Sequence, residues 1–276
     1  MIDQGIAPNP EVFLIDNTTK PPVSDQFSIG VRQRLGAMTL SASYSGVRSR
    51  NGFTFLFGNR RPDGTCCQGI PGFSNILISS DAKRTWYDAL FFQADKPLGG
   101  DRIRYGFSLT YTLADAKQNG GDLFSLDYPT VEDYPRYPTN TDERHRVVAT
   151  GIVQVPWNVY LSTLITLGSG TPYNIDDQSQ GGGVNERQFI RNGGRPDQFW
   201  FIFPDAWAYR SVDFRFRKDF PQFNGTRLGV TLDMFNVFNY KNFGCYDTGF
   251  QSPTLGDPSC TVGDPRRVQL GAEYNF

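Results

Sequence analysis

The sequence has little of what metal centres, nucleic-acid binding and membrane helices require. Its 276 residues include one histidine and four cysteines, which excludes most zinc sites, because these combine several His and Cys ligands. Lys and Arg number 27 against 28 Asp and Glu, so no excess of positive charge marks a nucleic-acid partner. No stretch approaches the roughly 18 to 20 apolar residues of a membrane helix.

Average hydropathy leaves the class of protein open. The mean hydropathy of −0.42 resembles that of a soluble protein, but a β-barrel with a wet interior and polar loops has a similar value. Aromatic residues make up 14% of the chain, which is too many for a disordered segment. Met1 is not followed by the charged and apolar regions of a signal peptide, so we expect either a cytosolic protein or part of a longer chain.

What the sequence does contain is alternation of apolar and polar residues. From Ile103 to Leu113, every second residue is apolar and the residues between them are polar or small. This is the pattern of a strand with one apolar and one polar face. The nine predicted strands are Phe27 to Leu35, Thr39 to Val47, Thr85 to Lys96, Ile103 to Leu113, Arg144 to Val155, Asn158 to Gly168, Val212 to Phe216, Leu228 to Met234 and Val268 to Phe276.

The connections between these strands alternate between two lengths. Short turns alternate with long loops, and a compact soluble domain rarely contains even one loop of that length. Alternating short turns and long loops are typical of outer-membrane barrels, whose long loops are extracellular. The predicted loops are Arg48 to Arg84, Asp115 to Glu143, Ser169 to Tyr209 and Asn239 to Pro265.

The predicted fold class is therefore all-β: an antiparallel segment of a transmembrane barrel, with its apolar face toward lipid. With about nine strands, the first and last run in the same direction, whereas single-chain bacterial barrels close with an even number of antiparallel strands. We therefore expect residues 27–276 to form the C-terminal part of a larger barrel, and residues 1–26 to be the remainder of an extracellular loop.

Several stretches, in order along the chain, resemble the TonB-dependent receptors of the outer membrane, in particular the Oar-like subgroup with a carboxypeptidase-regulatory-like domain. The resemblance implies a 22-stranded barrel closed by a plug, which is absent from this sequence, and opened by the inner-membrane partner TonB. The stretches are PPVSDQFSIGVRQRLG from Pro21, TWYDALFFQADKPLG from Thr85, YGFSLTYTLADA from Tyr105, TDERHRVVATGIVQVPW from Thr141, GSGTPYNI from Gly168, LDMFNVFNYKNFG from Leu232 and RRVQLGAEYNF from Arg266.

The last predicted strand looks like the signal that the barrel-assembly machinery reads on its clients. Its apolar residues alternate up to an aromatic residue at the chain end, although a final strand that merely ends in Phe is the alternative. The residues concerned are Val268, Leu270, Ala272, Tyr274 and Phe276.

His145 and the charges of the wet faces offer weak candidates for chemistry. His145 has only carboxylates near it in sequence, so a hydrogen-bonding role is favoured over metal binding or proton transfer. The charged set around Asp213, Arg215 and Arg217 resembles a salt-bridged wall more than a pair of catalytic carboxylates, because interior charges must be paired or hydrated. We expect no catalytic residue, metal or cofactor.

The four cysteines lie in predicted loops. Adjacent cysteines bridge only with strain, so Cys66 and Cys67 are not expected to pair, and the favoured disulfide joins Cys245 to Cys260 across the last loop. Ligand contacts are expected from aromatic residues of the loops, with packing of the loops on themselves as the alternative. These residues are Phe53, Phe55, Tyr134, Tyr137, Trp200 and Trp207.

Two functions remain open at this point. The resemblance implies an outer-membrane receptor fragment that contributes to energy-coupled uptake of a siderophore, oligosaccharide or peptide. The alternative is a secreted or surface β-protein that acts as an adhesin or carbohydrate-binding module. For the receptor, the expected partners are outer-membrane lipid, the barrel-assembly machinery, the plug and remaining strands, and TonB through the plug; nucleic acid is not expected.

Overall fold

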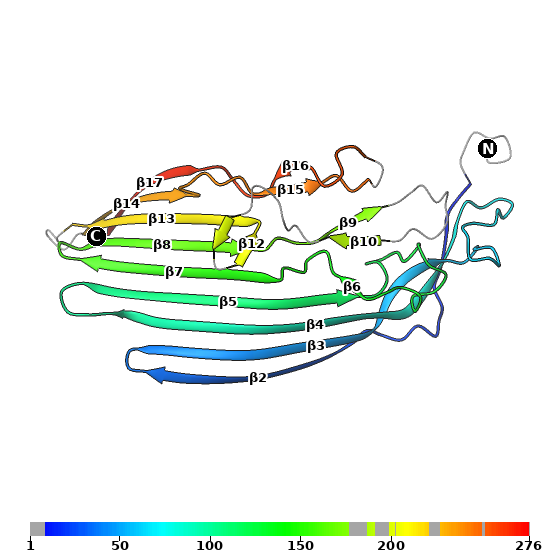
Figure 1. The fold of residues 1–276 in the computed structure, drawn as a ribbon, viewed down its shortest axis with the longest axis horizontal. Coiled ribbons are helices and arrows are strands. Elements are labelled where there is room, and N and C mark those ends of the chain that lie inside the picture. Colours follow the sequence, from blue (N-terminus) through cyan, green and yellow to red (C-terminus); the bar gives the residue numbers. More distant parts are fainter. Residues whose placement is uncertain are drawn as a thin grey trace.

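The computed structural model describes residues 9–176, 187–190, 199–201, 203–220, 227–249 and 252–275. Within these ranges the chain forms one large sheet and three small hairpins (Figure 1). The main path of the sheet runs in the order β2-β3-β4-β5-β7-β8-β13-β14-β17. Its strands are β2 (Val23–Leu35), β3 (Met38–Phe57), β4 (Ile76–Gly99), β5 (Arg104–Gln118), β7 (His145–Val155), β8 (Val159–Gly168), β13 (Tyr209–Asp219), β14 (Arg227–Phe235) and β17 (Arg267–Asn275).

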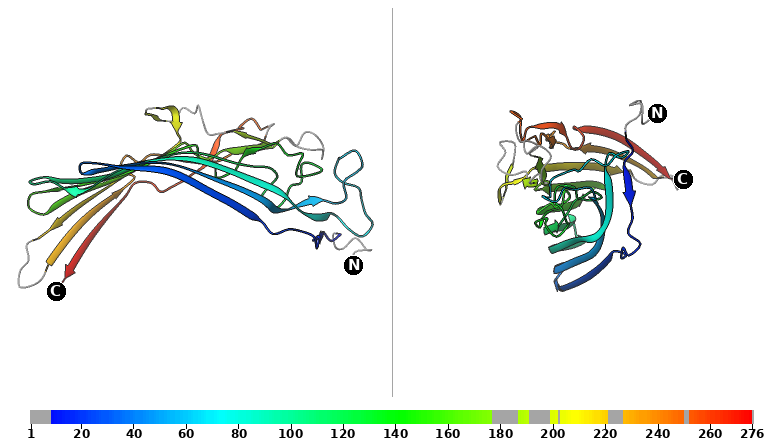
Figure 2. Two further views of the ribbon diagram at one scale, coloured as in Figure 1. Left: turned by 90° about the horizontal axis from the view of Figure 1, so that it is seen from below. Right: turned by 90° about the vertical axis from the view of Figure 1, so that its right-hand side faces the viewer.

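Every pairing along this path is antiparallel, and each of the nine strands except the last pairs with the next of the nine along the chain. The all-β antiparallel fold and its nine strands are therefore confirmed. The sheet curls into an open trough, and β2 and β17 lie at its two edges (Figure 2). Among the described residues, no helix has the length and apolar character needed to cross a membrane.

The remaining strands are short; β1 precedes β2, and the others lie in the long connections. β1 (Val12–Leu14) pairs parallel with the start of β4, and β6 (Tyr137–Pro138) pairs with the end of β5. The three hairpins are formed by β9 (Tyr173–Asp176) with β10 (Arg187–Ile190), by β11 (Phe199–Phe201) with β12 (Phe203–Trp207), and by β15 (Phe243–Tyr246) with β16 (Pro258–Thr261).

One predicted boundary is wrong by a wide margin. The predicted loop from Arg48 to Arg84 is shorter in the structure, because β3 continues to Phe57 and β4 already begins at Ile76. Beyond two register shifts near Gly52, the strands pair again as far as Phe57 opposite Leu77. Burial explains the extension, since Phe55 and Leu77 are 8% and 2% exposed.

The register places apolar side chains on one face across the whole sheet. Leu109 lies opposite Ala94 on β4 and Ala149 on β7, and Ile165 on β8 lies opposite Val212 on β13. We call this the apolar face; its large side chains are well exposed, with Ile29 at 74% and Leu270 at 76%. A sheet face of this kind requires an apolar solvent or partner.

The tightest burial lies among the loops and not within the sheet. The largest fully buried side chains, at under 2% exposure or close to it, come from loops or from strand ends near them. A sheet of a single layer has no second layer to cover it, so the loops that pack together at one end of the strands form the compact part of the molecule. These side chains are Trp207, Leu77, Val131, Thr54, Asp142 and Ser125.

Candidate functional site

The face opposite the apolar face carries paired charges, and we call it the polar face. Arg215 on β13 lies opposite Asp233 on β14, and its Nε and Nη2 donate to the two carboxylate oxygens at 2.5 and 3.0 Å. The Asp233 side chain is 8% exposed. The two-pronged contact fixes both side chains, because the guanidinium fork matches the two carboxylate oxygens.

A second set of ion pairs extends this row of paired charges along the polar face toward the short turns. Arg217 donates to Asp219 at 2.7 Å on its own strand and to Glu273 of β17 at 2.9 Å. The three strands β13, β14 and β17 are thus tied across the polar face by charge-assisted hydrogen bonds. The sequence-predicted charges on these strands are brought together as a salt-bridged wall, the alternative favoured over catalytic carboxylates.

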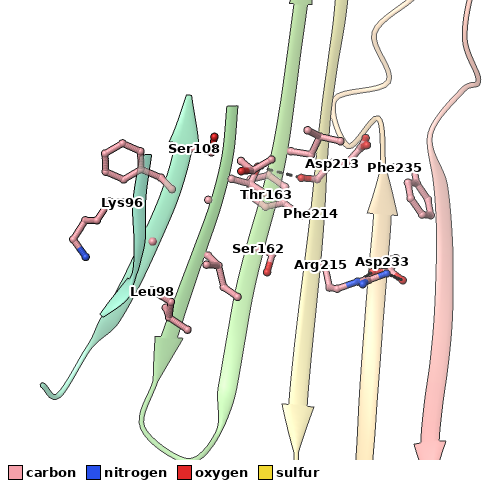
Figure 3. Close-up of a pocket in the computed structure, with 16 residues that line it drawn as sticks. Lys96, Leu98, Ser108, Ser162, Thr163, Asp213, Phe214, Arg215, Asp233 and Phe235 are labelled. Carbon is pink, nitrogen blue, oxygen red and sulfur yellow. Dashed lines mark hydrogen bonds and ion pairs between the residues drawn. The ribbon is translucent and has the colours of Figure 1, made fainter. Parts of the chain in front are cut away.

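A groove of about 570 Å³ runs over the polar face beside these pairs (Figure 3). Its lining includes the hydroxyl-bearing side chains of Ser108 and Ser162, and Ser162 lies opposite Arg215 on the polar face. A volume of this order is typical of ligand pockets. Hydroxyls and ion-paired carboxylates offer hydrogen bonds to a polar surface laid against the wall.

His145 serves as a hydrogen-bonding residue in the structure. Its Nδ1 lies 2.8 Å from the Tyr111 hydroxyl, the two rings are stacked, and the ring of Trp207 meets the imidazole edge-on. Among the residues that the structure describes, no group of three or more His, Cys, Asp and Glu could hold a metal ion.

The loop aromatic residues predicted to contact ligand are placed mostly inside the loop layer. Phe55 packs edge-on against Phe53 with ring centroids 4.9 Å apart. Tyr134 and Tyr137 are 5% and 6% exposed, and Trp207 is 1% exposed. Burial favours the alternative in which the loops pack on themselves, so the ligand role of these rings stays a prediction.

Trp200 lies on β11, and its side chain is outside the described residues. The Tyr134 hydroxyl accepts the main-chain N–H of Asp127, and the Tyr137 hydroxyl donates to the carbonyl of Gly120.

Sequence reasoning missed three polar side chains that fasten the loops. The Asp142 carboxylate, 1% exposed, accepts the N–H of Ala116 at 2.8 Å. The Asn242 amide accepts from the N–H of Arg210 at 2.7 Å and donates back to its carbonyl at 2.9 Å. Asn119 accepts the N–H of Arg84. These hydrogen bonds join segments that are distant in the sequence. Nothing in the sequence distinguishes the Asn and Asp residues that form them from other Asn and Asp residues in loops.

The cysteines form two disulfides. Cys245 and Cys260 are joined across the β15–β16 hairpin, with Cα atoms 5.3 Å apart, which is a usual separation for a disulfide. Cys66 and Cys67 are also joined to each other, against the expectation from strain that these neighbours stay unpaired.

The proposed assembly signal forms the free edge of the sheet. Val268, Leu270 and Tyr274 on β17 lie on the apolar face and are 60% or more exposed. Ala272 lies between Leu270 and Tyr274 on the same face, opposite Val230 of β14. Phe276 falls outside the described residues.

Comparison with known proteins supports the same architecture. A structure of the outer membrane transporter YddB from Escherichia coli is similar, with a TM-score of 0.67 at 10% sequence identity, over 96% of this chain. The chain spans about a third of that protein, since the match covers 34% of its length. A search among curated proteins finds no significant match. The model of the family described as outer membrane beta barrel domain matches residues 3–200, more than half of the sequence, so the chain belongs to this family of the bacterial outer membrane.

Proposed function

We propose that the chain forms barrel strands of a TonB-dependent receptor that takes up a siderophore, oligosaccharide or peptide by energy-coupled transport. The proposal rests on three supports: the ordered stretches that resemble this family, the family of outer-membrane barrels to which the chain belongs, and the similarity in fold to an outer membrane transporter. In this proposal residues 1–26 belong to an extracellular loop and residues 27–276 to the barrel.

Within the structure itself, the observation that supports the proposal most is the ion-paired wall of the polar face. Arg215 with Asp233, and Arg217 with Asp219 and Glu273, form a hydrogen-bonded layer across three strands. The interior of a wide barrel is polar and is filled by water or by a plug. A wall of neutralised pairs suits contact with a hydrated plug that must slide or unfold, because each charge keeps its partner when the plug moves.

The partners follow from the two faces. The apolar face contacts lipid, the polar face contacts the plug, and the terminal strand is read by the barrel-assembly machinery. TonB acts through the plug, so the plug and the strands that flank β2 and β17 are contributed by residues other than these 276.

Uptake measurements in the native bacterium test this function. Strains with and without the gene receive iron as a siderophore, carbon as an oligosaccharide, or nitrogen as a peptide. We expect the intact strain to take up one of these, and uptake to stop when TonB is deleted or the proton gradient is collapsed. Gene-dependent uptake that continues without TonB would contradict energy coupling. A pair swap, Arg215→Asp with Asp233→Arg, should preserve uptake better than either change alone.

A further inference from the structure

A second pocket lies on the polar face, where the strands give way to the long loops. Its volume is about 460 Å³, which is within the range of ligand pockets. It lies between the loop-side ends of β7 and β13 and the β15–β16 hairpin, which is placed past those ends (Figure 1). We call it the loop-end pocket. It shares no lining residue with the groove beside Arg215, so it is a separate site.

One wall of the loop-end pocket is an ion pair set beside a glycine. The register aligns Arg146 of β7 with Gly168 of β8, and Gly168 with Tyr209 of β13. The Glu143 carboxylate occupies the space that a side chain at position 168 would need, since a Cβ there would overlap its Oε1. Glu143 pairs with Arg146 at 2.8 Å and accepts the N–H of Gly170 at 3.3 Å. The carboxylate is therefore held in place, and its charge is neutralised by Arg146.

This ion pair offers both a donor and an acceptor to the pocket. Of the hydrogen bonds between described residues, one uses the Arg146 guanidinium, from its Nη1 to Glu143. The Arg146 side chain is half exposed, so its Nε and Nη2 can donate to a ligand. Each oxygen of the Glu143 carboxylate has two acceptor sites, so Glu143 can accept a further N–H. Because the pair has no net charge, it suits a neutral group with one donor and one acceptor.

The rest of the loop-end pocket is mainly apolar. The apolar and aromatic residues that line it are Pro172, Ala208, Tyr209, Phe243, Tyr246 and Val262. The Tyr246 hydroxyl donates to the carbonyl of Phe243 at 3.0 Å. Apart from the ion pair and the tyrosines, the polar side chains of the lining are Thr171 and Asn242, and the Asn242 amide is engaged on both atoms by the main chain of Arg210. The pocket therefore suits a ligand with an apolar body.

This chemistry distinguishes between oligosaccharide, siderophore and peptide. An oligosaccharide exposes hydroxyl groups along its whole length, and burying them requires more free hydrogen-bonding groups than this pocket has. A siderophore surrounds its iron with several polar oxygen atoms and meets the same obstacle. A peptide residue carries one N–H and one C=O. In an extended peptide both point to the same side, as in a hydrogen-bonded pair of antiparallel strands, and the side chain remains for the apolar part.

We propose that the loop-end pocket binds a peptide through one large apolar or aromatic residue. Arg146 donates to the carbonyl oxygen of that residue, Glu143 accepts its N–H, and its side chain lies among the apolar lining. The inference rests on the proposed function and deepens it, because it names peptide as the class of substrate.

Four ligands test the chemistry without any change to the protein. The receptor, extracted from its own outer membrane, is titrated by calorimetry with acetyl-Ala-Phe-Ala-amide, with the same peptide carrying Ser in place of Phe, with the Phe peptide methylated at the Phe nitrogen, and with a linear trisaccharide. We expect the Phe peptide to bind, and the other three to bind at least about tenfold more weakly, because the Ser peptide loses apolar burial and the methylated peptide loses the hydrogen bond to Glu143. Absence of binding by the Phe peptide, or equal binding by any of the other three, would overturn the proposal.

Matched variants locate the binding site. Val262→Trp places a large ring in the apolar part of the pocket, and the Val262 side chain is exposed enough to be enlarged without displacing a core. Arg146→Gln with Glu143→Gln removes the ion pair and keeps its shape. Each should weaken binding of the Phe peptide at least about tenfold. The control, Arg104→Gln, changes an arginine that contacts Gln154 near the short turns and should stay within about twofold of native. An equal loss in the control, or no loss in Val262→Trp and in the double variant, would refute the location.

Binding to the extracted receptor requires neither TonB nor a proton gradient, so this test and the uptake test fail separately. TonB-dependent uptake without binding of the Phe peptide would overturn the pocket assignment alone. Binding of the Phe peptide with the expected loss in the variants would support the assignment, even if uptake proved independent of TonB.

Discussion

Among the charged groups of the polar face, the Asp233 carboxylate depends most on its partner, because it is nearly buried and accepts two hydrogen bonds from Arg215. Changing Asp233 to Asn should lower the free energy of unfolding by about 1 to 3 kcal/mol, the range for losing charged hydrogen bonds at a buried group. Glu273→Gln is the control, since Glu273 is half exposed and its loss should cost clearly less than the loss of Asp233. Urea unfolding of the two variants in lipid measures the difference. Equal losses would show that burial of Asp233 does not matter.

Neighbouring residues on one strand test the direction of each face. Leu109→Arg and Leu232→Arg place a charge on the apolar face and should cost roughly 2 to 4 kcal/mol near the bilayer midplane, as should Phe214→Arg. Ser108→Arg and Thr231→Arg, one position away on the polar face, should cost less. Stability of the folded barrel in lipid, measured by its resistance to urea, compares the two sets. If Arg is tolerated equally on both faces, the apolar face does not contact lipid.

Asp247 gives the last outer loop a defined response to pH. Its carboxylate accepts hydrogen bonds from Ser252, Thr254 and the N–H of Gly249, and these hold the pKa of Asp247 below its ordinary value of 3.8. A lowered folded pKa stabilises the loop above the unfolded pKa, and this stability is lost as pH falls through the folded value. We therefore expect protection of residues 252–257 from hydrogen exchange to be constant between about pH 7 and 5 and to fall below about pH 4. Asp247→Asn should remove that dependence; an unchanged profile in the variant would assign it to another group.

At the scale of elements, the β15–β16 hairpin depends on its disulfide. Closing a loop of about 16 residues contributes around 3 kcal/mol in the chain-entropy description, so reduction should open the hairpin before the barrel strands. Peptide mapping without reduction should show Cys245 linked to Cys260, and Cys66 linked to Cys67. Free thiols at Cys245 and Cys260, or a link from either to Cys66 or Cys67, would contradict the pairing.

The extended β3–β4 hairpin shows what the sequence could and could not predict. Alternation identified the nine strands, because each has one face against an apolar solvent and one against water. Phe53, Phe55 and Phe57 also alternate, yet they fall within the predicted loop from Arg48 to Arg84. Their pairing depends on the loop layer, including Phe124, which stacks on Phe55. That contact joins segments far apart in the sequence, so no local pattern reveals it.

The candidate site was predictable to a similar extent. Alternation placed Arg215, Arg217 and Asp233 on the polar face. In the structure Arg215 pairs with Asp233, and Arg217 pairs with Asp219 and Glu273. The row formed by Arg48, Trp86 and Lys117 was not visible in advance, because only the register of β3, β4 and β5 brings these three side chains side by side.

At the scale of the whole molecule, the sheet formed by the described residues has two unpaired edges, β2 and β17, that run in the same direction. Unpaired backbone groups in lipid cost several kcal/mol each, and in water such edges and the apolar face drive aggregation. We expect these residues, expressed alone, to form inclusion bodies and to resist folding into detergent. Strands supplied as a second chain should improve folding. A monodisperse monomer that conducts ions in planar bilayers would show that the sheet closes unaided.

The common direction of β2 and β17 also sets a parity rule for whatever completes the barrel. Each added antiparallel strand reverses direction, so a complement that pairs correctly with both edges must begin and end with strands that point outward, and it must be odd in number. A second copy in the same orientation has nine strands, an odd number, but its edges point inward and would meet β2 and β17 in parallel. Two copies therefore cannot close an antiparallel barrel, and the complement must be a different set of strands.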